Sequence, residues 1–306
     1  MKINNLFTIG QIGRGVKLPT MKLIQSFTIT ILWANSFIGF AQSHATRNTS
    51  LREAYKNVET CEWLDLSKQK IGQLPDSLFL LTNLKYLDLS HTHLQELPLR
   101  IGELKQLRYL VLSHNQLKNL PLQISELSLL QSLYLDHNPE LDVAEAIHHL
   151  NELPNLHMLS LAGDHISTIP SEISSLKVLE SLELSENEFS ILPETMIQMK
   201  KLKVLYINND PYFNLKDNFR VLSKINNLNE LHIENDSLNE IPAGISQLKS
   251  VEYLFLVGNN ISELPSEIGR MKKLKLLDMS ENPLPPPLYN ETLSPQLNIK
   301  FRKKEN

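Results

Sequence analysis

The chain has 306 residues, with 30 lysines and arginines against 34 aspartates and glutamates, and a formal net charge of −4 at pH 7. This mild balance, without a clustered basic face, excludes nucleic acid as an expected partner. Cys61 is the only cysteine, so no disulfide can form within the chain. We interpret Cys61 as a buried thiol that packs as a small hydrophobic side chain.

The first 41 residues predict an N-terminal extension followed by a secretory signal peptide. Residues 21–43 read MKLIQSFTITILWANSFIGFAQS, with Lys22 ahead of an apolar-leaning stretch and small residues near its end. Cleavage is expected after Ala41, and Met21 is an alternative start to Met1. Polar residues dilute the stretch, whereas a permanent membrane helix needs ~20 apolar residues. We therefore expect a secreted, periplasmic or extracellular protein without stable membrane insertion after cleavage.

Residues 42–60 are expected to form an N-terminal cap built on one helix. In SLREAYKNVET, which begins at residue 50, Ser50 and Glu53 are spaced as a capping box. One helical face carries Leu51, Ala54, Tyr55 and Val58. Such a helix would cover the open edge of the array that follows, because the stacking face of a terminal repeat otherwise meets water.

From residue 61 onward the sequence is periodic. Residues 107–121, LRYLVLSHNQLKNLP, give the pattern L-x-x-L-x-L-x-x-N-x-L-x-x-L-P, which recurs in steps of 23 or 26 residues. Its first apolar position is occupied by Cys61, Leu84, Leu107, Leu130, Leu156, Leu179, Leu202, Leu228, Val251 and Leu274. A period of 20 to 50 residues indicates a repeat architecture, so residues 61–284 are expected to form one array of ten units.

These residues resemble a leucine-rich repeat protein over Trp63 to Leu284. The tail L-P-x-x-I-x-x-L, as at Leu97, Pro98, Ile101 and Leu104 and again at Leu264, Pro265 and Ile268, is similar to the Ras-group subfamily. The leader segment makes a secreted bacterial type the nearest match. The resemblance implies an α/β fold, a right-handed horseshoe solenoid whose inner face binds other macromolecules, usually proteins. Cysteine-flanked end caps, common in extracellular animal members of the family, are absent.

Within each repeat the L-x-L segment predicts a short strand. In the second repeat Leu87 and Leu89 are expected to point into the core while Tyr86 and Asp88 alternate outward. Stacked repeats then form a parallel sheet on the concave face, with about 4.8 Å between strands.

The turn after each strand carries a ladder residue with a structural role. An asparagine amide there can donate to and accept from the backbone of neighbouring turns. The asparagines are Asn115, Asn138, Asn187, Asn259 and Asn282. Aspartates replace them at Asp164, Asp210 and Asp236, and Gln69 and Thr92 fit imperfectly, so we expect a weaker ladder at those five turns.

The Leu-Pro step after the turn predicts one or two short helical turns on the convex face. Repeats four and seven lack this step and are three residues longer. Their VAEAIHHLNEL and KDNFRVLSKINNL segments predict fuller helices. Residues 285–306 are expected to be a C-terminal cap with a basic tail, in which Leu297, Ile299 and Phe301 alternate as in a final strand. A lipid-binding tail is the alternative.

The metalloprotease H-E-x-x-H, P-loop, C-x-x-C and G-x-S-x-G motifs are absent, and nearly every residue already has a role in the repeat, so we expect neither an enzyme nor a cofactor. His91, His114 and His137 occupy the same position in three successive repeats, along one rim of the sheet. An ordinary variant of the exposed turn is the favoured interpretation. Contact with a partner and a metal site are the two alternatives.

The outward strand positions are the predicted binding surface. The candidate residues are Tyr86, Tyr109, Val111, Tyr134, Met158, Glu183, Tyr206, His232, Tyr253 and Phe255. Solvent-facing aromatic side chains on a rigid surface are typical of binding hot spots. Glu180, Glu183 and Glu186 form an acidic step that favours a basic group on the partner. The alternative is that the tyrosines lean on one another across neighbouring strands.

The sequence therefore predicts a non-catalytic module that binds a protein or peptide on its concave face. An intracellular signalling scaffold of the Ras-group type is one alternative, and it requires an uncut N-terminal segment. Metal binding through the histidine rim is the other. The sequence predicts no oligomeric state.

Overall fold

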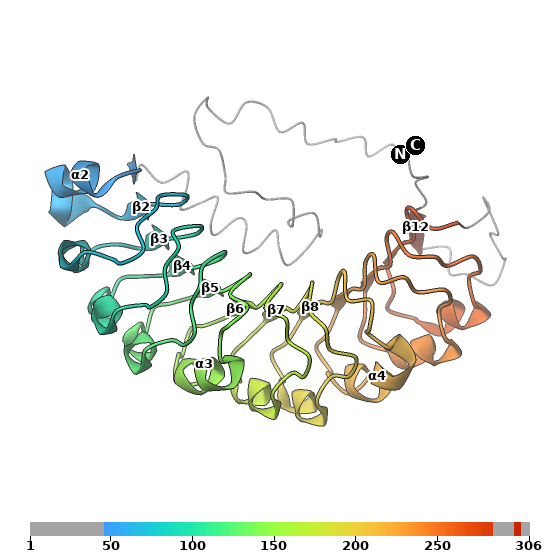
Figure 1. The fold of residues 1–306 in the computed structure, drawn as a ribbon. Coiled ribbons are helices and arrows are strands. Elements are labelled where there is room, and N and C mark those ends of the chain that lie inside the picture. The colour runs from blue at the N-terminus through green and yellow to red at the C-terminus, as the bar shows by residue number, and fades with distance from the viewer. Residues whose placement is uncertain (1–45, 284–296, 301–306) are drawn as a thin grey trace, which may run out of the picture. The chain divides into compact units, whose positions relative to one another are not determined.

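The computed structural model describes residues 46–283 and 297–300, and each repeat within them contributes one short strand to a single parallel sheet (Figure 1). The sheet has twelve strands, and their spatial order follows the chain from β1 to β12. The strands are β1 (Arg47–Asn48), β2 (Trp63–Asp65), β3 (Tyr86–Asp88), β4 (Tyr109–Val111), β5 (Ser132–Tyr134), β6 (Met158–Ser160), β7 (Ser181–Glu183), β8 (Val204–Tyr206), β9 (Glu230–His232), β10 (Tyr253–Phe255), β11 (Leu276–Asp278) and β12 (Asn298–Lys300).

The strands pair in the register that the repeat predicts. Leu64 lies opposite Leu87, Leu87 opposite Leu110, and Leu110 opposite Leu133, and all four side chains are fully buried. The leucine two residues after each of them, as at Leu89 and Leu112, is fully buried as well. Since every repeat adds the same inward residues, one apolar core runs the length of the array.

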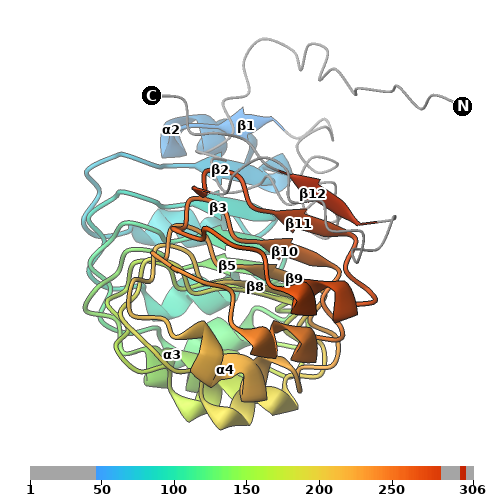
Figure 2. The ribbon, with the colours of Figure 1, turned by 90° about the vertical axis from the view of Figure 1, so that its right-hand side faces the viewer.

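Short helices line the outer side of the array, opposite the strands (Figures 1 and 2). Most are single 3-10 turns: η2 (Asp76–Leu80), η3 (Leu99–Glu103), η4 (Leu122–Glu126), η5 (Ser171–Ser175), η6 (Glu194–Gln198), η7 (Ala243–Gln247) and η8 (Ser266–Arg270). Each starts after a proline, whose ring fixes φ for the entry, and each buries its third residue, as at Ile101. The predicted short convex turns are confirmed.

Repeats four and seven hold the fuller helices that their extra length predicts. Helices α3 (Val143–Leu150) and α4 (Leu215–Leu222) have eight residues each. Asp142 and Asn214 cap their N-termini by accepting a hydrogen bond from the backbone N–H of the third helical residue. Ile147 and Phe219 turn into the shared core.

The α-helix expected in the N-terminal cap is shorter than the sequence indicates. Ser50 caps a helix as predicted, because its hydroxyl accepts from the Glu53 N–H at 3.2 Å. However, α2 spans only Leu51–Ala54 and gives way to the 3-10 segment η1 (Tyr55–Thr60), where Asn57 leaves helical geometry. The placement of Tyr55 on the buried face is wrong. Tyr55 is 36% exposed and its hydroxyl bonds Ser77, since the chain changes to tighter 3-10 geometry at this residue.

The first ladder turn also differs from the rest. Gln69 leaves the ladder and donates from its side chain to the Thr49 carbonyl at 2.9 Å, on the surface. Cys61, in the same repeat, is buried as predicted, and burial raises the pKa of its thiol.

The final strand of the sheet is β12, where an alternating segment was expected, and it pairs in parallel with β11. Leu297 and Ile299 pack partly buried against the core. Phe301, the basic tail and the signal peptide expected within residues 1–41 lie outside the described residues. In the part of the chain that the structure describes, no helix has the length and apolar character needed to cross a membrane.

Candidate protein-interaction surface

The predicted binding residues stand in two columns on the inner face of the sheet. One column holds the first residue of each repeat strand and the other holds the third, and residues in a column lie opposite one another across neighbouring strands. Tyr86 pairs with Tyr109 in the first column, and Val111 pairs with Tyr134 in the second. The structure therefore brings the predicted residues together on one face of the sheet.

The expectation that all these side chains face solvent is wrong. Tyr86, Tyr109, Glu183, Tyr206, His232 and Phe255 are buried. One reason is lateral packing, since strands this close bring successive rings into contact. The ring centroids of Trp63 and Tyr86 are 4.8 Å apart, and those of Tyr86 and Tyr109 are 6.4 Å apart. At this end of the sheet the structure agrees with the alternative interpretation of the sequence, in which the aromatic rings pack against one another across neighbouring strands.

Four predicted residues keep part of their surface accessible: Val111, Tyr134, Met158 and Tyr253. The first three come from the adjacent strands β4, β5 and β6, so they form one neighbourhood, which we call the central apolar patch. Tyr253 lies apart on β10, where the Lys275 ammonium group sits 5.9 Å from its ring centroid. Burial raises the pKa of the Tyr134 phenol, which stays neutral near pH 7.

Asp136 lies beside the central apolar patch, and it is not among the predicted binding residues. It follows β5 at a position where Ser90 and Ser113 stand in the preceding repeats. Its carboxylate accepts from the hydroxyls of Ser113, at 2.6 Å, and Ser160. Comparison of that single column across the repeats is the signal that would have found it. The patch is therefore bordered by a partly exposed carboxylate that two serine hydroxyls hold in place.

The predicted acidic step is weaker than its three glutamates indicate. Glu180 forms an ion pair with Lys203 at 2.7 Å. Glu183 is buried, and its carboxylate accepts from the Ser185 N–H at 2.9 Å. Burial outweighs that hydrogen bond and raises the pKa of Glu183 to about 7. Only Glu186 keeps its side chain half exposed.

The second predicted patch is a closed stack around His232. Its ring lies 4.3 Å from the Tyr206 ring and 4.2 Å from the Phe255 ring. Its two nitrogens bond the carboxylates of Glu230, at 2.9 Å, and Glu234, at 2.7 Å. Burial lowers the pKa of His232, but the bonds to both glutamates overcome it and the net pKa is raised. The second predicted patch is therefore a buried stack of rings, and its central histidine is bonded to two glutamates.

The histidine rim is a stack of parallel rings. The centroids of His91 and His114 are 4.1 Å apart and those of His114 and His137 are 4.2 Å apart, with ring planes 10° and 24° from parallel. Ring nitrogen lone pairs lie in the ring plane, so stacked rings do not converge on one ion. Among the described residues, no group of three possible ligands is placed to hold a metal ion.

The rim position has a backbone role in every repeat. All its occupants adopt a left-handed conformation, with φ between 55° and 70°: Lys68, His91, His114, His137, Gly163, Glu186, Asn209, Asn235, Gly258 and Glu281. At Gly163 a Cβ atom would lie 2.1 Å from the His137 ring, so the glycine makes room for the last imidazole. The geometry agrees with an ordinary turn variant, the favoured interpretation.

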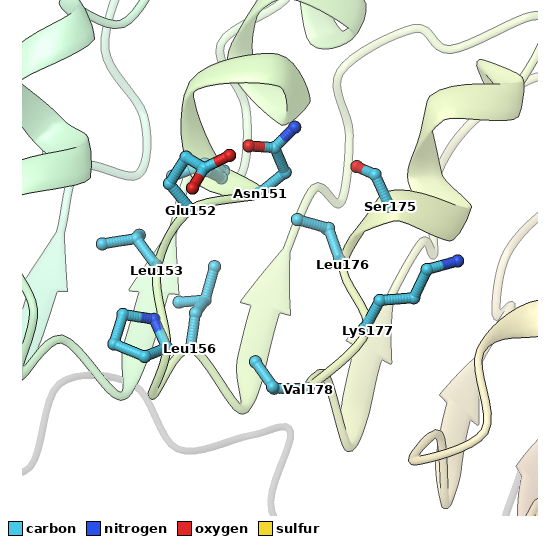
Figure 3. Close-up of a pocket in the computed structure, with 10 residues that line it drawn as sticks. Asn151, Glu152, Leu153, Leu156, Ser175, Leu176, Lys177 and Val178 are labelled. Carbon is cyan, nitrogen blue, oxygen red and sulfur yellow. The ribbon is translucent and has the colours of Figure 1, made fainter.

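A small pocket lies on the outer side, between the end of α3 and η5 (Figure 3). Leu153, Leu156 and Leu176 form its apolar wall, and Glu152 and Lys177 stand at its edge. Its volume of about 140 Å³ is below the several hundred Å³ typical of small-molecule sites. This pocket is therefore too small to be a binding site that competes with the inner face of the sheet.

The fold and this surface define a class of protein: a solenoid that presents one parallel sheet. Comparisons with known proteins identify the class further. A family model described as leucine-rich repeat matches residues 59–117 and 226–284, and a second, described as leucine-rich repeat region, matches residues 137–237. The chain belongs to the leucine-rich repeat family, whose domains typically serve protein–protein interaction.

Solved structures agree with this assignment at the level of the fold. An internalin from Listeria monocytogenes is 20% identical, with a TM-score of 0.62 over 85% of this chain and 72% of the internalin chain. A leucine-rich repeat protein of Leptospira interrogans is 24% identical, with a TM-score of 0.51 over 85% and 82% of the two chains. A search of curated proteins finds no match.

Proposed function

We propose that the protein is a non-catalytic module that binds a protein or peptide on the inner face of its sheet. The observation that carries the proposal is the central apolar patch, where Val111, Tyr134 and Met158 stay partly accessible on adjacent strands. Rigid strands hold these side chains in place, so a partner buries them at little cost in side-chain entropy. Asp136 adds one fixed acceptor for a basic or hydroxyl group.

The experiment begins by cross-linking the purified protein to identify a partner and measuring the dissociation constant of the pair. Replacing Tyr134 and Met158 together with alanine is expected to weaken binding by at least about tenfold, the scale of a hot-spot loss. The matched control replaces Leu99 and Leu122 with alanine, because both side chains are exposed on the outer side of the same part of the array. If the control weakens binding and the inner pair does not, the proposal is wrong.

We also propose that the chain is exported, with residues 1–41 removed, residues 42–60 and 285–306 as caps, and residues 61–284 as the array. The support for export is the sequence pattern of residues 21–43, and the support for the array is the repetition of strands and short helices from Trp63 to Asp278. Mass spectrometry of the mature N-terminus and cell fractionation test it. An intact N-terminus in the cytosol would favour the signalling scaffold of the Ras-group type instead.

A further inference from the structure

The ladder turns of the central repeats mix amides and acids. Along the array the ladder position reads Asn138, Asp164, Asn187, Asp210, Asp236 and Asn259. Every one of these side chains is buried. Their backbone and side-chain hydrogen bonds link neighbouring repeats, so an amide and an acid at this position can be compared directly.

An asparagine at the ladder fills both of its hydrogen-bonding roles. The Asn187 side-chain oxygen accepts from the N–H groups of Asp164, at 3.1 Å, and Ile166, at 3.0 Å. Its amide nitrogen donates to the carbonyls of Leu184, at 2.7 Å, and Leu161, at 2.9 Å. The same pattern holds at Asn259, which donates to Leu256 and Ile233. Each amide thus satisfies backbone groups of its own turn and of the preceding one.

The aspartates fill only the accepting role. Oδ1 of Asp164 accepts from the Asn138 N–H at 2.6 Å, that of Asp210 from the Asn187 N–H at 2.8 Å, and that of Asp236 from the Asp210 N–H at 2.6 Å. Oδ2 of all three is buried and has no hydrogen-bond partner. Because Oδ1 fills the accepting role of the asparagine oxygen, we infer that Oδ2 occupies the place of the asparagine NH₂ group, which donates to backbone carbonyls at Asn187. An ionised carboxylate cannot bond them, because both sides are acceptors.

We propose that Asp164, Asp210 and Asp236 form a proton-operated latch in the middle of the array. With a proton on Oδ2, each carboxyl donates one hydrogen bond to one of the two carbonyls that an asparagine amide would bond, so it replaces one of the two bonds that the Asn187 amide makes. Without the proton, each turn buries a carboxylate oxygen against carbonyl oxygens. The latch does not depend on the partner proposed for the inner face.

The charges around the latch favour the protonated state. The ionisable groups that act on these carboxyls are themselves acidic: Asp136 on Asp164, Glu183 and Glu186 on Asp210, and Asp210 and Glu234 on Asp236. Burial is the main cause and outweighs the backbone bond at each site. It raises the pKa of Asp164 and of Asp236 to about 8 and that of Asp210 to about 7.

The sign of the effect follows from these raised pKa values. An unfolded aspartate loses its proton near its ordinary pKa of 3.8, whereas the folded groups hold theirs to about 7 or 8. The contribution of the three protonated carboxyls to the stability of the folded state is therefore complete below about pH 4, and it is lost as the pH rises toward about 8. Within that window each retained proton changes the unfolding equilibrium constant by about tenfold per pH unit. The strands held by these turns, β6 to β9, should therefore loosen under alkaline conditions.

The test compares the wild type with the triple variant D164N, D210N and D236N by urea unfolding from about pH 5 to about pH 9. The unfolding midpoint of the variant should exceed that of the wild type by an amount that grows as the pH rises, because its amides donate at every pH. A difference between the two that stays constant over this range, or that shrinks with pH, would overturn the latch.

Two matched variants and one direct measurement complete the design. N187D places a carboxyl at the ladder turn between Asp164 and Asp210. The urea unfolding midpoint of this variant should fall more steeply than that of the wild type as the pH rises. D76N changes a side chain that is 87% exposed and should leave the pH profile as it was. Carboxyl carbon NMR of the wild type should show three aspartates titrating above about pH 6. If all the aspartates titrate near the ordinary value for this side chain instead, the proposal is refuted even if no variant folds.

Discussion

At the scale of single residues, the array depends on inward leucines whose replacement leaves a cavity. Leu110 is fully buried in β4, between Leu87 and Leu133 of the flanking strands. Replacing it with alanine should cost about 2–5 kcal/mol of unfolding free energy, because the transfer and cavity terms add. Chemical denaturation followed by circular dichroism measures the loss.

The control for that prediction lies in the same repeat. Leu122 on η4 is 59% exposed, and its replacement with alanine should change the unfolding free energy by no more than about 0.5 kcal/mol. Equal losses at Leu110 and Leu122 would show that the inward and outward positions of the repeat are wrongly assigned.

At the scale of elements, the N-terminal cap begins with one side-chain bond. The Ser50 hydroxyl accepts from Glu53 N–H, and the Glu53 carboxylate accepts in turn from the Thr49 N–H at 2.9 Å. Ser50→Ala should cost about 0.5–2 kcal/mol, because an N-terminal backbone donor loses its partner. Amide hydrogen exchange should show faster exchange confined to α2, and unchanged protection there would count against the role of the cap.

At the scale of the whole molecule, the array carries a second pH-dependent group that acts against the latch. Burial and the neighbours His137 and His91 lower the pKa of His114 to about 4, and burial and Lys68 lower the pKa of His91. A depressed histidine pKa gives stability that is present above about pH 6.5 and lost as the pH falls. The histidine rim therefore weakens in acid, whereas the aspartate turns weaken in alkali.

His114→Asn tests the acid side of this balance. Asn209 and Asn235 hold the same left-handed position, with φ of 59° and 60°, so the substitution suits the backbone. The variant should lose less of its thermal midpoint than the wild type between about pH 6.5 and about pH 4. His148→Asn, on the outer helix α3, serves as the control. An acid slope that is the same in all three proteins would remove the rim as its cause.

The repeat pattern predicts most of this fold because the same positions have the same structural role in every repeat. The strand register, the outer helical turns and the longer helices α3 and α4 follow from spacing alone. The burial of Tyr109 and Tyr206 does not, since it depends on how rings pack after the strands are assembled. The weaker ladder expected at the aspartates agrees with the unpartnered Oδ2 atoms of Asp164, Asp210 and Asp236, whereas their raised pKa values depend on burial that only the folded structure shows.

The regular pitch of the sheet limits the ligands that can follow it. Strands recur about every 4.8 Å along the array, whereas same-side residues of an extended peptide recur about every 6.6 Å. The two intervals coincide at about 19–20 Å, which is four strands of the sheet and six residues of the peptide. A peptide laid across the strands would therefore carry its anchoring side chains six positions apart. An alanine scan of a bound peptide that shows anchors at every second residue would indicate another orientation.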